Sequence, residues 1–192
     1  MDHLLILAEA VTRNPTPDGD GLVTFTNVVT RAGSGFGFAV TAVTVLFIRA
    51  KTGSWHSVKQ RSIWQPWAAA WVTMILAAAV SGGFIKKISN GLTSGGNTAG
   101  RVVGDAAIGQ SGEGGIDVSF GQVVSYGGSW LVLVCVAGLA FFIWFAKTWG
   151  TRGLYLTGAI TGSTWGITSA LGGWAAMVFV PLFTWLGDSV IG

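Results

Sequence analysis

The chain has 192 residues, a formal net charge of +3 and a pI near 9.4. Hydrophobic residues make up 51% of it and charged residues only 10%, and its mean hydropathy is +0.60. Ordinary soluble domains carry about 25% charged residues, so one soluble core cannot hide this much apolar surface. We therefore expect an all-α integral membrane protein with the lipid bilayer as its main partner. Because the basic residues lie beside the ends of apolar runs, membrane topology explains them and we expect no nucleic-acid partner.

Four apolar runs are the candidate transmembrane helices; the first is marginal in length, and Lys86 and Lys87 at the far end of the second oppose its assigned orientation, which the larger cluster from Arg49 to Arg61 outweighs. A span needs about 20 apolar residues. The first run, about 33–48, reaches a sufficient length if Arg31 and Arg49 extend their aliphatic stems to opposite interfaces. The second covers about 64–85, and the third covers about 126–146 and closes with the Trp and Lys residues expected at an interface.

The last run, Gly153 to Gly187, is too long for one ordinary span. Its 35 residues carry no charge. As one helix it would be about 50 Å long, against a hydrocarbon core of about 30 Å. The alternatives are a strongly tilted helix, a span preceded by an interfacial helix, and two re-entrant pieces broken near Gly172-Gly173. We favour one span over about 160–185 that is kinked near Pro181.

The charges separate onto the two sides that these spans define. Residues 49–63 and 147–153 carry six Lys and Arg and no acidic residue, whereas all eight acidic residues lie on the other side. Lys and Arg near span ends stay in the cytoplasm, so we expect a protein of the cytoplasmic membrane with both termini extracytoplasmic. The predicted units are an extracytoplasmic N-terminal segment (1–31), a first helical hairpin (32–87), a Gly-rich extracytoplasmic loop (88–125) and a second helical hairpin (126–192).

The Gly-rich loop is the one sizeable segment expected in water. Ten of the 38 residues from Ile88 to Ser125 are glycine, and large apolar groups are few, which favours a flexible loop. Within it Ile116, Val118 and Phe120 alternate with polar residues, which is the period of a short strand. Such a strand needs an edge to pair with, either in residues 22–29 or in a neighbouring subunit.

Small residues recur at four-residue spacing in several runs. Such lines let helix backbones approach closely, and in lipid this packing is a main force between helices. The lines either hold the helices of one monomer together or join copies, and we favour self-association into a homo-oligomer. The predicted oligomer-packing residues are Gly33, Gly37, Ala78, Gly82, Gly158, Gly162, Gly166 and Ala170.

The basic side of the topology also predicts contact with anionic phospholipid. Each basic residue near an anionic lipid surface contributes about 1 kcal/mol of attraction. The alternative is that these charges only set the orientation of the protein during insertion. The predicted headgroup-binding residues are Arg49, Lys51, Lys59, Arg61, Lys147 and Arg152.

The sequence contains no constellation typical of catalysis or metal binding. His3 and His56 are isolated, and the single cysteine, Cys135, lies inside the third run. The interiors of the runs carry hydroxyl groups and no charges, which disfavours an ion-coupled transporter. We therefore predict no enzyme, no catalytic residue, no cofactor and no metal.

A short recurrence bears on the organisation of the spans. Residues 50–52 and 146–148 both read Ala-Lys-Thr, which favours two tandem helical hairpins that each turn through a basic cytoplasmic loop. In layout, and in no motif, this is similar to conjugative pilins and some phage holins, which join two apolar helices by a short polar turn and oligomerise. We expect a non-enzymatic, self-associating subunit of a membrane assembly, such as a secretion or conjugation component or a pilus-like polymer. The alternative is a pore-former, either a holin-type protein or a small-solute channel lined by the hydroxyl groups.

Overall fold

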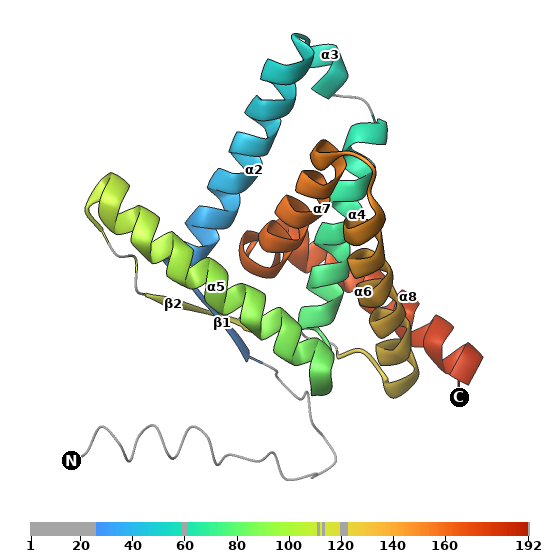
Figure 1. The fold of residues 1–192 in the computed structure, drawn as a ribbon. Coiled ribbons are helices and arrows are strands. Elements are labelled where there is room, and N and C mark those ends of the chain that lie inside the picture. Colours follow the sequence, from blue (N-terminus) through green and yellow to red (C-terminus); the bar gives the residue numbers. More distant parts are fainter. Residues whose placement is uncertain (1–25, 59–60, 111, 113, 120–122, 192) are drawn as a thin grey trace, which may run out of the picture.

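The fold is built almost entirely of helices (Figure 1). The structure is a computed structural model and describes residues 26–58, 61–110, 112, 114–119 and 123–191. Most of the predicted N-terminal segment, residues 1–25, lies outside this part. The elements in chain order are β1 (Thr26–Thr30), α2 (Arg31–Thr52), α3 (Trp55–Val58), α4 (Arg61–Ala78), α5 (Gly83–Ile108), β2 (Gly115–Ser119), α6 (Tyr126–Phe145), α7 (Trp149–Thr161), the π-helix η1 (Gly162–Gly166) and α8 (Ala170–Ile191).

Three helices are long and apolar enough to cross a membrane individually. These are α2, α6 and α8, and α4 and α5 meet the same criterion only as a pair bent by 115°. The described chain therefore has three candidate spans, or up to four if the bent pair counts as one. This confirms the prediction of an all-α protein with membrane-spanning helices. It leaves the predicted pair of hairpins untested.

Helix α4 is the centre of the molecule. Its residues Met74, Ile75 and Leu76 are each only 1% exposed, because α5, α6, α7, η1 and α8 all pack around this helix. The helix ends at Ala78, and α5 starts after a sharp turn in which Gly83 has a φ of 76°, a left-handed conformation that favours glycine. The predicted second span, 64–85, therefore covers most of α4, the turn after it and the first residues of α5.

The predicted flexible loop contains a long helix, α5, which is a correction. This helix runs obliquely across the lower ends of α2 and α4 (Figure 1). Its glycines permit close packing: an added Cβ at Gly100 would meet the backbone of Ala32, and one at Gly96 would meet the side chain of Thr164. The glycine-rich composition predicted a flexible loop, whereas in the fold the glycines allow α5 to approach α2 and η1.

The predicted short strand is present as β2. It pairs antiparallel with β1, from Thr26 opposite Ser119 to Thr30 opposite Gly115, so its partner is the N-terminal segment of the same chain. Phe120, the last residue of the predicted strand, lies outside the described residues. Thr30 then caps α2 by accepting from Gly33 N at 3.0 Å, and this capping joins the ribbon to the start of the first span.

The last apolar run is not the single kinked span that we favoured. It contains α7, the π-helix η1 and α8. The helix continues through Ile167 and Thr168 and is interrupted at Ser169, and Pro181 lies inside α8. The hydroxyl of Ser169 accepts from Gly172 N at 3.1 Å and acts as an N-cap for α8, which explains why a new helix starts there. The re-entrant alternative placed a break near Gly172-Gly173, and the observed break lies a few residues before these glycines.

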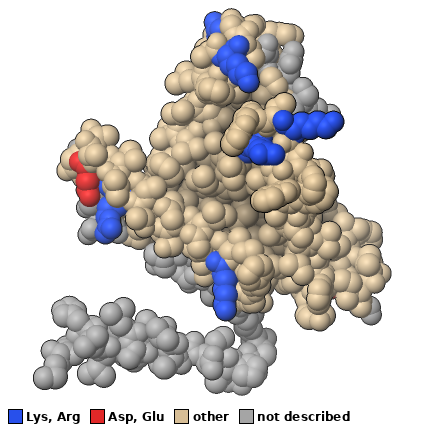
Figure 2. Space-filling view, viewed as in Figure 1, with Lys and Arg blue, Asp and Glu red and all other residues tan. Residues whose placement is uncertain are grey.

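The charged residues described by the structure lie toward two ends of the molecule (Figure 2). We call the first the basic end, which comprises Arg49, Lys51, Lys147 and Arg152. At the opposite end Arg31 N donates to Gly114 O at 2.9 Å, and Ser125 Oγ donates to Asp188 Oδ1 at 2.7 Å. Gly187 also packs against Gly127 there, so α8 finishes beside the start of α6. The last apolar run, 153–187, thus starts at the basic end and finishes at the opposite end, despite its internal break.

Candidate functional site

The longest line of small residues packs inside the chain, between α7 with η1 and the central helix α4. An added Cβ at Gly162 would lie 2.6 Å from the carbonyl oxygen of Trp71 and 3.0 Å from its Cα. Gly158 faces the carbonyl of Trp67 in the same way, and Gly166 faces the indole nitrogen of Trp71. These contacts correspond to the alternative in which the line holds one monomer together.

The other predicted oligomer-packing residues divide into two groups. Gly33 faces Asn97 of α5, and Gly37 faces Thr164 and Trp165, so the α2 line also packs within the chain. The remaining residues form no continuous helical line. Helix α4 ends at Ala78 before Gly82, and Ala170 is an exposed first residue of α8.

Buried hydroxyl groups surround η1 and bond to the backbone. Thr161, Ser163 and Thr164 are all 0% exposed. Thr161 Oγ1 donates to Thr157 O at 2.8 Å, and Thr164 Oγ1 donates to Ile160 O at 2.8 Å.

One of these hydroxyl bonds links two helices. Thr93 Oγ1 of α5 donates to Ser163 O at 2.8 Å. Since the hydroxyls of this cluster bond to backbone carbonyls and are sealed in protein, they line no lumen in the described part of one chain.

Arg152 at the basic end caps a helix. Its Nε donates to Ala146 O at 2.9 Å and its Nη2 donates to Trp144 O at 3.0 Å, while the guanidinium lies 5.5 Å from the ring centroid of Trp149. The C-terminus of α6 carries unsatisfied carbonyls and the negative end of the helix dipole, so a cation is stabilising there. This role competes with the predicted contact between Arg152 and lipid headgroups.

The other cations at the basic end have different surroundings. The Arg49 guanidinium lies 5.3 Å from the ring centroid of Trp55, and Lys147 is exposed. Lys51 extends from the last turn of α2 toward the first turn of α7, where an added Cβ at Gly150 would lie 3.6 Å from its Nζ. Lys59 lies outside the described residues, and the structure places only the backbone of Arg61, at the start of α4.

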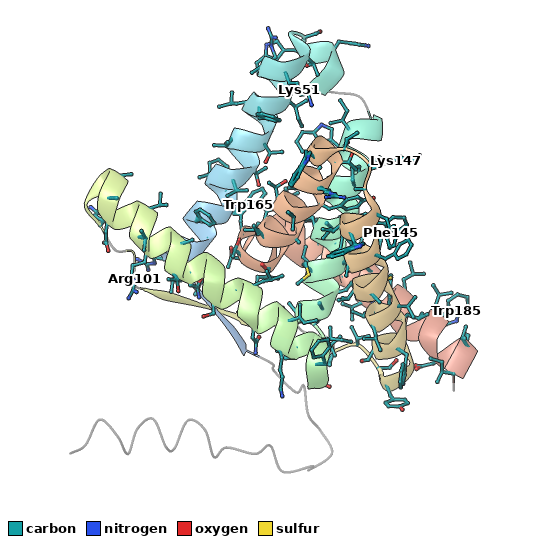
Figure 3. The ribbon with its side chains drawn as sticks, viewed as in Figure 1. Lys51, Arg101, Phe145, Lys147, Trp165 and Trp185 are labelled. Carbon is teal, nitrogen blue, oxygen red and sulfur yellow. The ribbon has the colours of Figure 1, made fainter. Side chains whose placement is uncertain are left out.

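A cavity of about 630 Å³ lies beside Lys51, between α2 and α7. We call it the α2–α7 groove; Lys51 lines it, and Figure 3 shows Lys51 near the end of α2. The residues that define it include Phe47, Ile48 and Lys51 of α2, Ile63 of α4, and Thr151 and Leu154 of α7. Sequence reasoning predicted Lys51 as a headgroup contact and missed the groove, because residues of α2 and α7 are adjacent only in the folded chain.

The described residues contain no group of three or more His, Cys, Asp or Glu that could hold a metal ion. Comparison of the chain with protein-family models, with curated proteins and with solved structures finds no match. Any functional proposal therefore depends on the surface that the helices leave open and on the basic end with its groove.

Proposed function

We propose that the protein is a non-enzymatic, self-associating subunit of a membrane-embedded assembly, such as a secretion or conjugation component or a pilus-like polymer. The observation that carries this proposal is the small share of each candidate span that the chain itself buries. The buried shares are 22% for α2, 17% for α6 and 28% for α8. Most residues of these helices therefore keep some surface open to lipid or to other copies.

The outer face of α8 is the contact that best fits a second copy. Trp174 is 71% exposed, Met177 75% and Trp185 66%, while Ala176 and Val180 on the other face of the helix are buried. Tryptophan supplies a large, rigid contact area and is enriched at the energetic centres of interfaces. Because the small-residue lines are already used inside the chain, we assign association to these large side chains.

We further propose that the basic end faces the cytoplasm and that both termini are extracytoplasmic. The argument is the excess of Lys and Arg at that end, together with the absence of acidic residues from positions 49–63 and 147–153. The folded chain supports it by keeping Lys51 and Arg152 at one end and Asp188 at the other.

Native mass measurement in a mild detergent tests the association. The expected species are multiples of the 19.9 kDa chain. Trp174→Ala should weaken the oligomer by about 2 kcal/mol or more, as expected for a residue at the centre of an interface. Trp144→Ala is the matched control, because Trp144 is 76% exposed on α6.

Two results would count against the proposal. If the wild-type protein is monomeric at all concentrations, the proposed self-association is rejected. If the Trp174 and Trp144 substitutions weaken the oligomer equally, self-association stands but its assignment to the outer face of α8 is rejected. The pore-forming alternative predicts release of a small dye from vesicles containing the protein, and the sealed hydroxyl cluster around η1 gives it no support from a single chain.

A further inference from the structure

The α2–α7 groove joins a cationic mouth to an apolar wall at the basic end. We propose that it binds one anionic phospholipid, with the headgroup phosphate at Lys51 and the first turn of α7, and with an acyl chain along the wall. The inference rests on the proposed membrane location and deepens it, because it assigns one lipid to one site rather than a diffuse attraction to the whole basic end.

The mouth of the groove is suited to a phosphate group. Lys51 Nζ lies beside Gly150 in the first turn of α7, where the helix dipole is positive and the amides of Trp149 and Gly150 precede those bonded to the capping residue Thr148. Thr148 Oγ1 lies 2.8 Å from Thr151 Oγ1 and accepts from Thr151 N at 3.3 Å, so two hydroxyls are held at the same turn. A cation, a helix N-terminus and the one hydroxyl hydrogen that this pair leaves over converge there.

Among the residues that the structure describes, no acidic side chain lies near that cation. Positions 49–63 and 147–153 contain no Asp or Glu, and the described acidic side chains Asp105 and Asp188 belong to the opposite end. The described part of the chain therefore offers the mouth no carboxylate, and the phosphate of an anionic lipid would complement its charge.

The wall of the groove distinguishes a lipid from a free phosphate. One helical turn before Lys51, the side chain of Phe47 lines the groove, with Ile48 beside it and Leu154 facing from α7. A volume of about 630 Å³ is far larger than a phosphate ion needs and lies within the usual range of about 300–1,000 Å³ for small-molecule sites. A phosphate ion would occupy only the mouth, whereas a phospholipid places its phosphate there and covers the apolar wall.

The other basic residues give the proposal a sharp control. Arg152 is bonded to the carbonyls of α6, and Arg49 stacks on Trp55. Lys147 is exposed at the same end and does not line the groove. Removing the charge of Lys147 therefore changes the net charge of the basic end as much as removing the charge of Lys51, while leaving the groove intact.

Native mass spectrometry of the full chain in detergent tests the site. The protein is titrated with phosphatidylglycerol, with phosphatidylcholine of the same acyl chains, and with inorganic phosphate. The wild type should retain phosphatidylglycerol in preference to phosphatidylcholine, and Lys51→Gln should lower that preference roughly fivefold, the effect of one basic residue near an anionic lipid. Lys147→Gln should leave it within about twofold, since its charge lies outside the groove.

A second pair of variants tests the groove independently of charge. Gly150→Leu places a side chain against Lys51 at the mouth and should abolish retention of both lipids. Gly138→Leu is the control, because an added Cβ at Gly138 of α6 meets nothing within 4 Å. Thermal unfolding of each variant confirms that it is folded.

Three outcomes would overturn the proposal. Equal losses for Lys51→Gln and Lys147→Gln mean a diffuse cationic surface, and full retention by folded Gly150→Leu means that the groove is not the site. Displacement of phosphatidylglycerol by millimolar inorganic phosphate means a free-anion site. The same spectra report the number of copies, so a monomer that keeps the lipid preference rejects the proposed assembly alone, and an oligomer without the preference rejects the lipid site alone.

Discussion

Substitution of Gly162 by alanine tests whether the glycine line of α7 and η1 packs within one chain. The added Cβ would lie 2.6 Å from Trp71 O, 3.0 Å from Trp71 Cα and 3.1 Å from Met74 Cβ. Ordinary contacts between carbon atoms are about 3.5–4.0 Å, so η1 and α4 must move apart by a few tenths of an ångström or more. Both nearest atoms belong to the backbone of a central helix, so no side-chain rotation can relieve the contact.

The expected loss follows from two opposing contributions. Overpacking in a well-packed interior costs about 1–3 kcal/mol. Replacing a helical glycine by alanine returns about 0.5–1 kcal/mol through the lower entropy of the unfolded chain. We therefore expect Gly162→Ala to be destabilising by about 1–2 kcal/mol net. Gly153→Ala in α7 is the control: an added Cβ there meets nothing within 4 Å, so only the favourable contribution remains.

Denaturant unfolding in detergent, followed by tryptophan fluorescence at several protein concentrations, measures this loss. A destabilisation that is independent of concentration supports packing within the chain. The reasoning is refuted if Gly162→Ala unfolds like the wild type but dissociates the oligomer, because the line would then join copies, as the sequence led us to favour.

Two further predictions concern the ends of the molecule. Arg152→Gln should lower the free energy of unfolding by about 1–3 kcal/mol, as expected when hydrogen bonds from a charged group are lost, and an unchanged unfolding midpoint would reject its role as a cap for α6. In a Cys135→Ser background, cysteines at the exposed positions Ala50 and Thr98 should react differently with an impermeant thiol reagent on intact cells, Thr98→Cys at once and Ala50→Cys only after lysis. Labelling of Ala50→Cys from outside would reverse the orientation.

The spans bounded by charge were the most predictable elements. The sequence predicts the third span over about 126–146, and α6 covers Tyr126–Phe145. The two agree closely because the run has the length of a span, carries no charge and is bounded by residues typical of an interface. Helix α2 extends beyond the predicted 33–48 at both ends and includes both flanking arginines, Arg31 and Arg49. The period of two in residues 116–120 likewise indicated β2, since alternation reports directly on the two faces of a strand.

The elements that sequence reasoning missed depend on contacts between distant residues. Helix α5 is stabilised by the close approach of Gly96 and Gly100 to η1 and α2, which composition alone cannot show. The π-helix η1 and the break before α8 lie in a run with no charge, so no local signal marked them, although Ser169 is a recognisable capping residue. The α2–α7 groove has the same origin, because Lys51 and Gly150 come together only when α2 and α7 pack.

The number of copies in a membrane tests the central claim most directly. The Thr98→Cys, Cys135→Ser protein is labelled with one dye per chain, reconstituted into lipid bilayers at low density, and followed by single-molecule photobleaching. The proposed assembly predicts that most spots bleach in several steps, and that the number of steps does not change as the protein is diluted. Spots that bleach in a single step at every density would contradict it and would leave a monomeric membrane protein.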